Sequence, residues 1–203
     1  MKNSIESFFS VALKNYLVEN TAASILSRSL EHCGVGLFPS IDHCAIRTLD
    51  VENRAKFFLN LGFVPDEDTG TLEYDSWWAK VYRKPGWPAL FIDQAFAGER
   101  GKNSLIPEWV NEHGDEGFHH IAVLVEDIEN AIKVMKLKNV EFAGNVIGEP
   151  GTDLRQIFTQ PEIKNGKAFS VLELIERQNG YSGFLPPQAD GLMESTRMRH
   201  IRK

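Results

Sequence analysis

Cysteine is scarce in this chain, with two among 203 residues. Cys33 and Cys44 form neither a CxxC pair nor the paired spacing of a zinc ribbon, so neither a disulfide framework nor a thiolate metal site is indicated. No apolar run approaches the roughly 18 residues of a membrane span. Glu6 and Lys14 interrupt the apolar residues near the start, which a signal peptide does not tolerate. We therefore expect a mature cytoplasmic protein.

Basic clusters are also lacking. The chain has 22 Lys and Arg against 28 Asp and Glu, a formal net charge of -6. This balance argues against a nucleic-acid or anionic-membrane partner. The hydrophobic fraction of 42% is that of an ordinary globular protein, and the length suffices for one large domain or two small fused modules. The oligomeric state stays open, with a homodimer as one option.

The most informative feature that is present is an internal repeat. His43–Lys56 and His120–Lys133 share His, Ala, Asp, Glu, Asn and Lys at equal spacing, and the second stretch begins 77 residues after the first. Such a repeat indicates two copies of one module. Each copy reads as a strand followed by a helix that an aspartate caps, Asp50 in the first and Asp127 in the second.

Three strand candidates follow each predicted helix, separated by turns that contain Gly or Pro. The predicted helices cover 51–61 and 128–138, and the strand candidates cover 63–65, 77–83 and 89–94, then 141–147, 154–160 and 168–177. The pattern is βαβββ, twice. We therefore predict an α+β fold in which duplicated βαβββ modules form a curved eight-stranded open barrel, after an N-terminal helical extension. The predicted segments are 1–39 (helical extension), 40–110 (first module), 111–185 (second module) and 186–203 (C-terminal tail or lid helix).

The repeat separates the roles of two adjacent histidines. Neighbouring side chains of a strand point to opposite faces, and His120 occupies the repeat position of His43, whereas His119 occupies that of Asp42. We therefore expect His43 and His120 to point into a shared cavity. The alternative is that either histidine is a core residue with satisfied hydrogen bonds.

A carboxylate on the last predicted strand completes a candidate metal site. Glu173 lies in "AFSVLELIER" with apolar residues on both sides, and burying an unpartnered carboxylate costs several kcal/mol. Two His and one carboxylate with open positions form the facial triad of non-haem Fe(II) oxygenases. A structural ion pair of Glu173 with Arg47 or Arg155 is the alternative.

Aligning "PALFIDQ" of the first module on "SVLELIE" of the second sets Phe91 opposite Glu173. The protein then supplies three metal ligands and no fourth, and we expect no catalytic residue beyond these ligands. Three ligands leave room for a bidentate substrate and O₂, whereas a fourth would favour Lewis-acid isomerase or lyase chemistry.

These features resemble the vicinal oxygen chelate superfamily, which includes glyoxalases, bleomycin resistance proteins and dioxygenases. The stretches "HHIAVLVEDI", "LRQIFTQP", "LELIER" and "GYSGF" resemble the catalytic half of 4-hydroxyphenylpyruvate dioxygenase. In "DHCAIRT", Arg47 follows His43 by four residues on the same face, which resembles the 2-oxoadipate dioxygenase/decarboxylase family.

The resemblance implies an Fe(II)-dependent dioxygenase that decarboxylates and hydroxylates a 2-oxo acid with O₂, with the metal held by His43, His120 and Glu173. Arg47 would bind a substrate carboxylate and Gln156 would hydrogen-bond the substrate. The alternatives are an ion pair or surface charge for Arg47 and a strand-edge amide for Gln156. For the whole protein they are a glyoxalase-like isomerase or lyase that uses Zn, Ni or Mn, and a metal-free ligand-binding protein.

Overall fold

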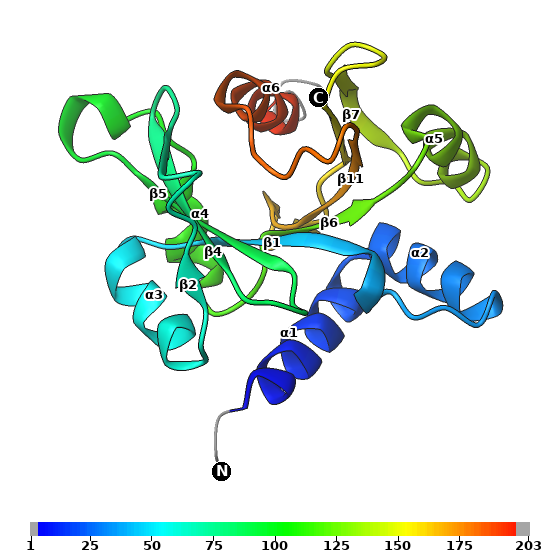
Figure 1. The fold of residues 1–203 in the computed structure, drawn as a ribbon. Coiled ribbons are helices and arrows are strands. Elements are labelled where there is room, and N and C mark those ends of the chain that lie inside the picture. The colour runs from blue at the N-terminus through cyan, green and yellow to red at the C-terminus, as the bar shows by residue number, and fades with distance from the viewer. Residues whose placement is uncertain (1–3, 198–203) are drawn as a thin grey trace. The chain divides into compact units, whose positions relative to one another are not determined.

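The computed structural model describes residues 4–197, which Figure 1 draws as helices and strands. The helices are α1 (Ile5–Glu19), α2 (Thr21–His32), α3 (Val51–Asn60), α4 (Ile106–His113), α5 (Ile128–Lys136) and α6 (Pro186–Arg197), with 3-10 turns η1 (Phe38–Ser40) and η2 (Gly98–Gly101). The strands are β1 (Ile41–Arg47), β2 (Val64–Pro65), β3 (Thr71–Glu73), β4 (Trp77–Arg83), β5 (Ala89–Ala95), β6 (His120–Leu124), β7 (Phe142–Ile147), β8 (Leu154–Thr159), β9 (Ile163–Lys164), β10 (Lys167–Ala168) and β11 (Val171–Arg177). Within residues 4–197, no helix is both long and apolar enough to cross a membrane.

The chain divides into two compact units, and each takes one of the N-terminal helices. The first unit joins α1 to His43–His119, and the second joins Asn20–Asp42, which contains α2, to the chain from His120 onward. The segments at 1–39, 40–110, 111–185 and 186–203 stay a prediction, and residues 198–203 of the last one lie outside the described part.

In the first unit the strands run in the order β2-β4-β5-β1, with β3 also paired to β4. β1 and β5 are parallel, and the other pairs are antiparallel. Helix α1 packs through aromatic rings: Phe8 lies 5.2 Å from Phe58 and 5.9 Å from Phe118 between centroids, and Phe9 stacks on Phe63 at 6.4 Å. Aromatic burial of this kind fastens the extension to the module that follows it.

In the second unit the order is β6-β11-β8-β7, again with one parallel pair, β6 with β11. Figure 1 shows α5 and α6 on opposite sides of this sheet. Helix α2 is attached by its first residues: Asn20 caps the helix at Ala23 N and also donates from Nδ2 to Ser170 Oγ at 3.1 Å, while Thr21 N donates to Glu162 at 2.7 Å.

The α+β class and the duplicated βαβββ modules are confirmed, with all eight predicted strands present. In neither unit does the row of strands close on itself. The helix caps are confirmed as well, because Asp50 accepts from Asn53 N and Asp127 from Asn130 N, both at 2.9 Å. The last strand begins at Val171 rather than at 168. Helix α4 and the short strands β3, β9 and β10 were not predicted.

The parallel pair of each module has the same register, which confirms the alignment of the two modules. The pairs are His43 with Ala89, Ala45 with Phe91 and Arg47 with Asp93 in the first module, and His120 with Val171, Ala122 with Glu173 and Leu124 with Ile175 in the second. In each module, the residue that follows these pairs on β5 or β11 accepts a hydrogen bond from the first backbone amide of the module's helix. Val51 N donates to Gln94 at 2.7 Å, and Ile128 N donates to Glu176 at 2.9 Å.

We predict that Asp127→Ala lowers the free energy of unfolding by about 1 kcal/mol, because two amides of the first turn of α5 depend on side-chain acceptors and the cap supplies one of them. Urea denaturation would measure the change. Asp127→Asn, which keeps an acceptor oxygen, should lose much less, and equal losses in the two variants would contradict the capping role.

Candidate metal centre

The second unit brings together two side chains of types that commonly ligate metal ions. His120 Nε2 lies 3.2 Å from Glu173 Oε2, and Glu173 is 1% exposed. Two ligand atoms bound at adjacent octahedral positions with bonds of about 2.1 Å would be about 3 Å apart. The spacing of these two atoms therefore fits a shared metal ion.

Gln156 fixes the other oxygen of the same carboxylate. Its Nε2 donates to Glu173 Oε1 at 2.6 Å, and both side chains are buried. We predicted Gln156 as a substrate-binding residue, and that role stays a prediction. The observed hydrogen bond predicts a second role for Gln156. A donor to the second oxygen of a ligating carboxylate fixes the orientation of that carboxylate.

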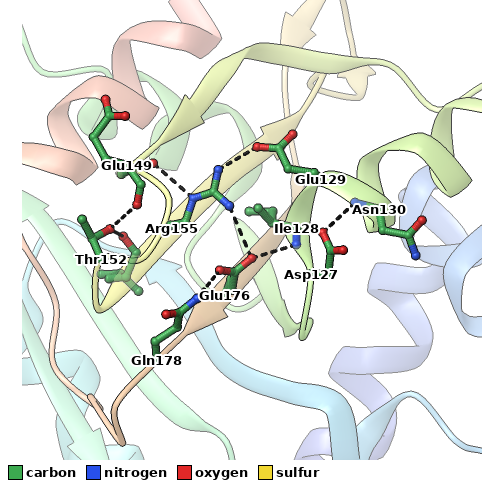
Figure 2. A network of polar contacts seen from close by, with 11 residues as sticks. Asp127, Ile128, Glu129, Asn130, Glu149, Thr152, Arg155, Glu176 and Gln178 are labelled. Carbon is green, nitrogen blue, oxygen red and sulfur yellow. Dashed lines mark hydrogen bonds and ion pairs between the residues drawn. The ribbon is translucent and has the colours of Figure 1, made fainter.

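The opposite face of the same strands carries a separate ionic network, drawn in Figure 2. Arg155 donates to Glu129 at 2.6 Å and lies 3.5 Å from Glu176, and Gln178 donates to Glu176 at 2.9 Å. Arg155 is thus engaged away from Glu173, which argues against the alternative that Arg155 is its structural ion-pair partner. The network attaches α5 to the sheet.

His43 occupies the equivalent strand of the first unit. It is 2% exposed, and its ring centroid lies 6.2 Å from that of Phe91. Phe91 pairs with Ala45 just as Glu173 pairs with Ala122. Because Phe91 has no ligand atom, the first module offers no counterpart to the carboxylate of the second.

Arg47 is buried on the same face as His43, so the alternative of a surface charge is wrong. It lies opposite Asp93 in the β1–β5 register, and its guanidinium carbon lies 5.6 Å from the ring centroid of Trp109. Burial lowers the pKa of Arg47 to about 10, an effect that the charge of Asp93 opposes. Burial raises the pKa of Asp93 to about 7, which the charge of Arg47 opposes in turn.

His119 and His120 differ in environment, as expected. The His119 ring packs edge-on against Trp109 at 5.5 Å in the first unit, whereas His120 lies 5.0 Å from Phe158 and faces Glu173 in the second. Our sequence reasoning missed Asp93, Trp109 and helix α4. A signal for Asp93 existed, since it is a charged residue within an otherwise apolar strand.

The chain matches the family model for the glyoxalase/bleomycin resistance protein/dioxygenase superfamily over residues 40–162, which is more than half of its length. The chain belongs to this superfamily. The match includes His43 and His120 and ends before Glu173. Membership confirms the resemblance at the level of the superfamily.

Solved structures extend the similarity beyond the two modules. Hydroxyglutarate synthase from Oryza sativa, in complex with 2-oxoadipate, has a TM-score of 0.75 at 16% identity, covering 97% of this chain and 93% of that one. A mutant of 4-hydroxymandelate synthase from Streptomyces coelicolor has a TM-score of 0.61 at 19% identity, covering 82% of this chain and 57% of that one. At these identities the likeness shows the fold.

A curated relative is much longer than this chain. The Caenorhabditis elegans protein C31H2.4 is 51% identical over 51 residues, which is 25% of this chain and 14% of that protein. This short match identifies a related segment and does not transfer an activity.

We predict that Gln156→Leu weakens metal affinity by about 10- to 100-fold, because Glu173 loses the donor that orients it. Competition with a fluorescent chelator would measure the affinity. Gln178→Leu is the matched control, since it removes a donor from the Glu176 carboxylate on the opposite face. A loss of affinity in both variants would assign the effect to general destabilisation instead.

Proposed function

We propose that the protein is an Fe(II)-dependent dioxygenase that oxidatively decarboxylates and hydroxylates a 2-oxo acid, with His43, His120 and Glu173 as the metal ligands. The observation that carries the proposal is the buried His120–Glu173 pair, whose carboxylate is oriented by Gln156. All three proposed ligands are buried, and each offers one ligand atom. His43 enters the proposal through its repeat equivalence to His120.

The donor set favours a metal with vacant coordination positions. Two imidazoles and one carboxylate are typical of non-haem Fe(II) oxygenases, and Phe91 stands where a fourth ligand of a symmetric site would be. When bound, the metal would supply O₂ activation and chelation of the 2-oxo acid. Zn, Ni or Mn in this position would instead support the isomerase or lyase alternative.

The residues of the chain would bind and orient the substrate. In this proposal Arg47 binds a carboxylate of the 2-oxo acid. The Gln156 amide orients the Glu173 carboxylate toward the metal, and Gln156 would also hydrogen-bond the substrate. Helix α6 packs on the face that carries Glu173, through Leu192 against Phe158 and Val171. We infer that it acts as a lid that excludes water from the reaction.

The overall reaction consumes one 2-oxo acid and one O₂ and releases CO₂. The keto carbon would become the new carboxylate with one oxygen atom, and the second oxygen atom would become a hydroxyl group on the shortened product.

The cytoplasmic location is part of the proposal, because both Cys33 and Cys44 are free thiols, as is usual in a reducing compartment.

We predict that the anaerobically purified protein, reconstituted with Fe(II), consumes O₂ and releases CO₂ in equal amounts with a 2-oxo acid. The panel would include 2-oxoadipate and 4-hydroxyphenylpyruvate, followed with an oxygen electrode. His120→Ala and Glu173→Ala should each lose metal and reduce turnover by at least about 100-fold, since each removes a proposed ligand. His119→Asn is the matched control and should keep the metal.

Two results would contradict the proposal in different directions. Stoichiometric metal binding without O₂ uptake for any acid would favour the isomerase or lyase. A protein that binds no divalent metal at all would favour the metal-free ligand-binding protein.

A further inference from the structure

In the second unit, the chain that follows β11 contacts the face of the sheet that carries Glu173 at two places. Tyr181 packs toward the end of β11, and Leu192 of α6 packs toward its start. The contacted residues are Ile175, Leu154 and Ala122 for Tyr181, and Val171, Phe158 and Ala143 for Leu192. Glu173 on β11 and Gln156 on β8 lie between the two contacts. The chain after β11 therefore encloses the proposed ligand and the amide that orients it from two sides.

Arg177 fastens the part of this segment that lies nearest to β11. It is the last residue of β11 and leaves the same face as Glu173, since the two are four residues apart on one strand. Its Nε and Nη2 donate to the two carboxylate oxygens of Asp42 at 2.7 and 2.9 Å, and its Nη1 donates to Gly183 O at 2.7 Å. The guanidinium carbon lies 5.2 Å from the ring centroid of Phe184. Bidentate arginine–carboxylate pairs are strong, so residues 183 and 184 are held to the start of β1.

Close packing inside the segment adds a second restraint on the same residues. A Cβ atom on Gly183 would lie 2.7 Å from the Tyr181 hydroxyl oxygen and 2.9 Å from Tyr181 Cζ, so this approach requires the absence of a side chain. Tyr181 N also donates to Gln178 O at 2.9 Å. Residues 178–184 thus form a compact turn between β11 and α6, which we call the lid base.

Helix α6 is held less firmly than the lid base. Of its side chains that the structure describes, Leu192 alone is buried. Gln188 Nε2 donates to Leu154 O at 3.2 Å, a longer bond than those of Arg177. Gln188 Oε1 is buried and has no donor among the residues that the structure describes. Burying an acceptor without a donor costs free energy, which the helix would recover when it opens and this oxygen meets water.

The first module has no equivalent of the Arg177–Asp42 pair. β5 and β11 both have seven residues and pair in the same register with β1 and β6, so Ala95 stands at the position of Arg177. Both residues are half-buried. His119 stands at the repeat position of Asp42. The pairing of the strands therefore does not require this ion pair, which occurs in the module that α6 follows.

We propose that Arg177 is a positioning residue that fixes the lid base, so that α6 opens and closes over the Glu173 face by pivoting after Phe184. This inference rests on the proposed function, in which α6 is a lid, and it identifies the part of the lid that stays in place. Leu185, between the lid base and α6, is 37% exposed, which suits a pivot. With its base docked, α6 returns to the same position over Glu173 at each closure.

The test is amide hydrogen exchange, followed by mass spectrometry, on the whole chain loaded anaerobically with Fe(II). In the parent we expect residues 188–196 to exchange at least about tenfold faster than residues 179–185, because α6 opens without the lid base. In Arg177→Gln the two segments should exchange at similar rates. Arg177→Lys, which keeps the charge and one donor, should fall between the two. Arg83→Gln is the matched control, since it removes an arginine–aspartate pair with Asp66 in the first unit and should leave both segments unchanged.

Steady-state kinetics give a readout that a purely structural role would not move. With whichever 2-oxo acid is turned over, Arg177→Gln should raise KM by about tenfold while kcat changes by less than about threefold, because a loose lid weakens the closed complex. The CO₂ released per O₂ consumed should fall below one, since water enters the site. A loss of folded protein would lower kcat and leave KM unchanged, and that pattern would refute the positioning role.

The exchange experiment needs no turnover, so the two proposals can fail separately. Slow exchange of residues 179–185 that persists in Arg177→Gln would overturn the anchoring role, whether or not the protein is a dioxygenase. Exchange of residues 179–196 as one unit in the parent would overturn the pivot after Phe184. The expected exchange pattern without O₂ uptake for any acid would support the anchored lid and contradict the dioxygenase.

Discussion

The site depends on one constraint, the register of the single parallel strand pair in each module. In a parallel pair, partner residues send their side chains to the same face, so the register decides which residues can act together. In the second module it sets Glu173 beside Ala122 and therefore beside the neighbouring His120. In the first module the same register sets Phe91 where the carboxylate would be. A shift of one residue would send every one of these side chains to the other face.

The two faces of the sheet in the second unit carry different sets of buried polar residues. One face holds the His120–Glu173 pair and is covered by α6, and the other holds Arg155 and Glu176, which anchor α5 (Figure 2). Buried acidic side chains thus occur on both faces of β11, but their partners differ. Glu176 has a permanent cation and a helix amide, whereas Glu173 has an amide and an imidazole. Only the second kind of environment leaves a carboxylate that can still gain from binding a cation.

Most of the fold could be predicted from the sequence, because each module of the repeat provides an independent check on the elements predicted in the other. The strand, cap and helix of each copy recur at the same spacing, and Gly62 and Asn139 take the left-handed conformation expected after the helix ends. Helix α4 could not be found in this way, since it lies outside the repeated stretch. For the site, His120 and Glu173 followed from alternation along strands, but the bond from Gln156 to Glu173 depends on the β8–β11 register, which local pattern does not specify.

Asp93, which the sequence analysis missed, could have been found by comparing the two modules position by position. The alignment of "PALFIDQ" on "SVLELIE" already set Asp93 against Ile175, and the structure agrees with it at Gln94 and Glu176, which receive equivalent helix amides. A duplicated fold supplies its own reference, because positions that serve the fold have the same physical role in both copies. Asp93 departs from this rule, since it is ionisable and 2% exposed, whereas Ile175 at the equivalent position is apolar and 0% exposed. His43 and His120 follow the rule, as both copies keep a buried imidazole at the same place. The metal-binding role that we propose for these two histidines is therefore one that both modules would share.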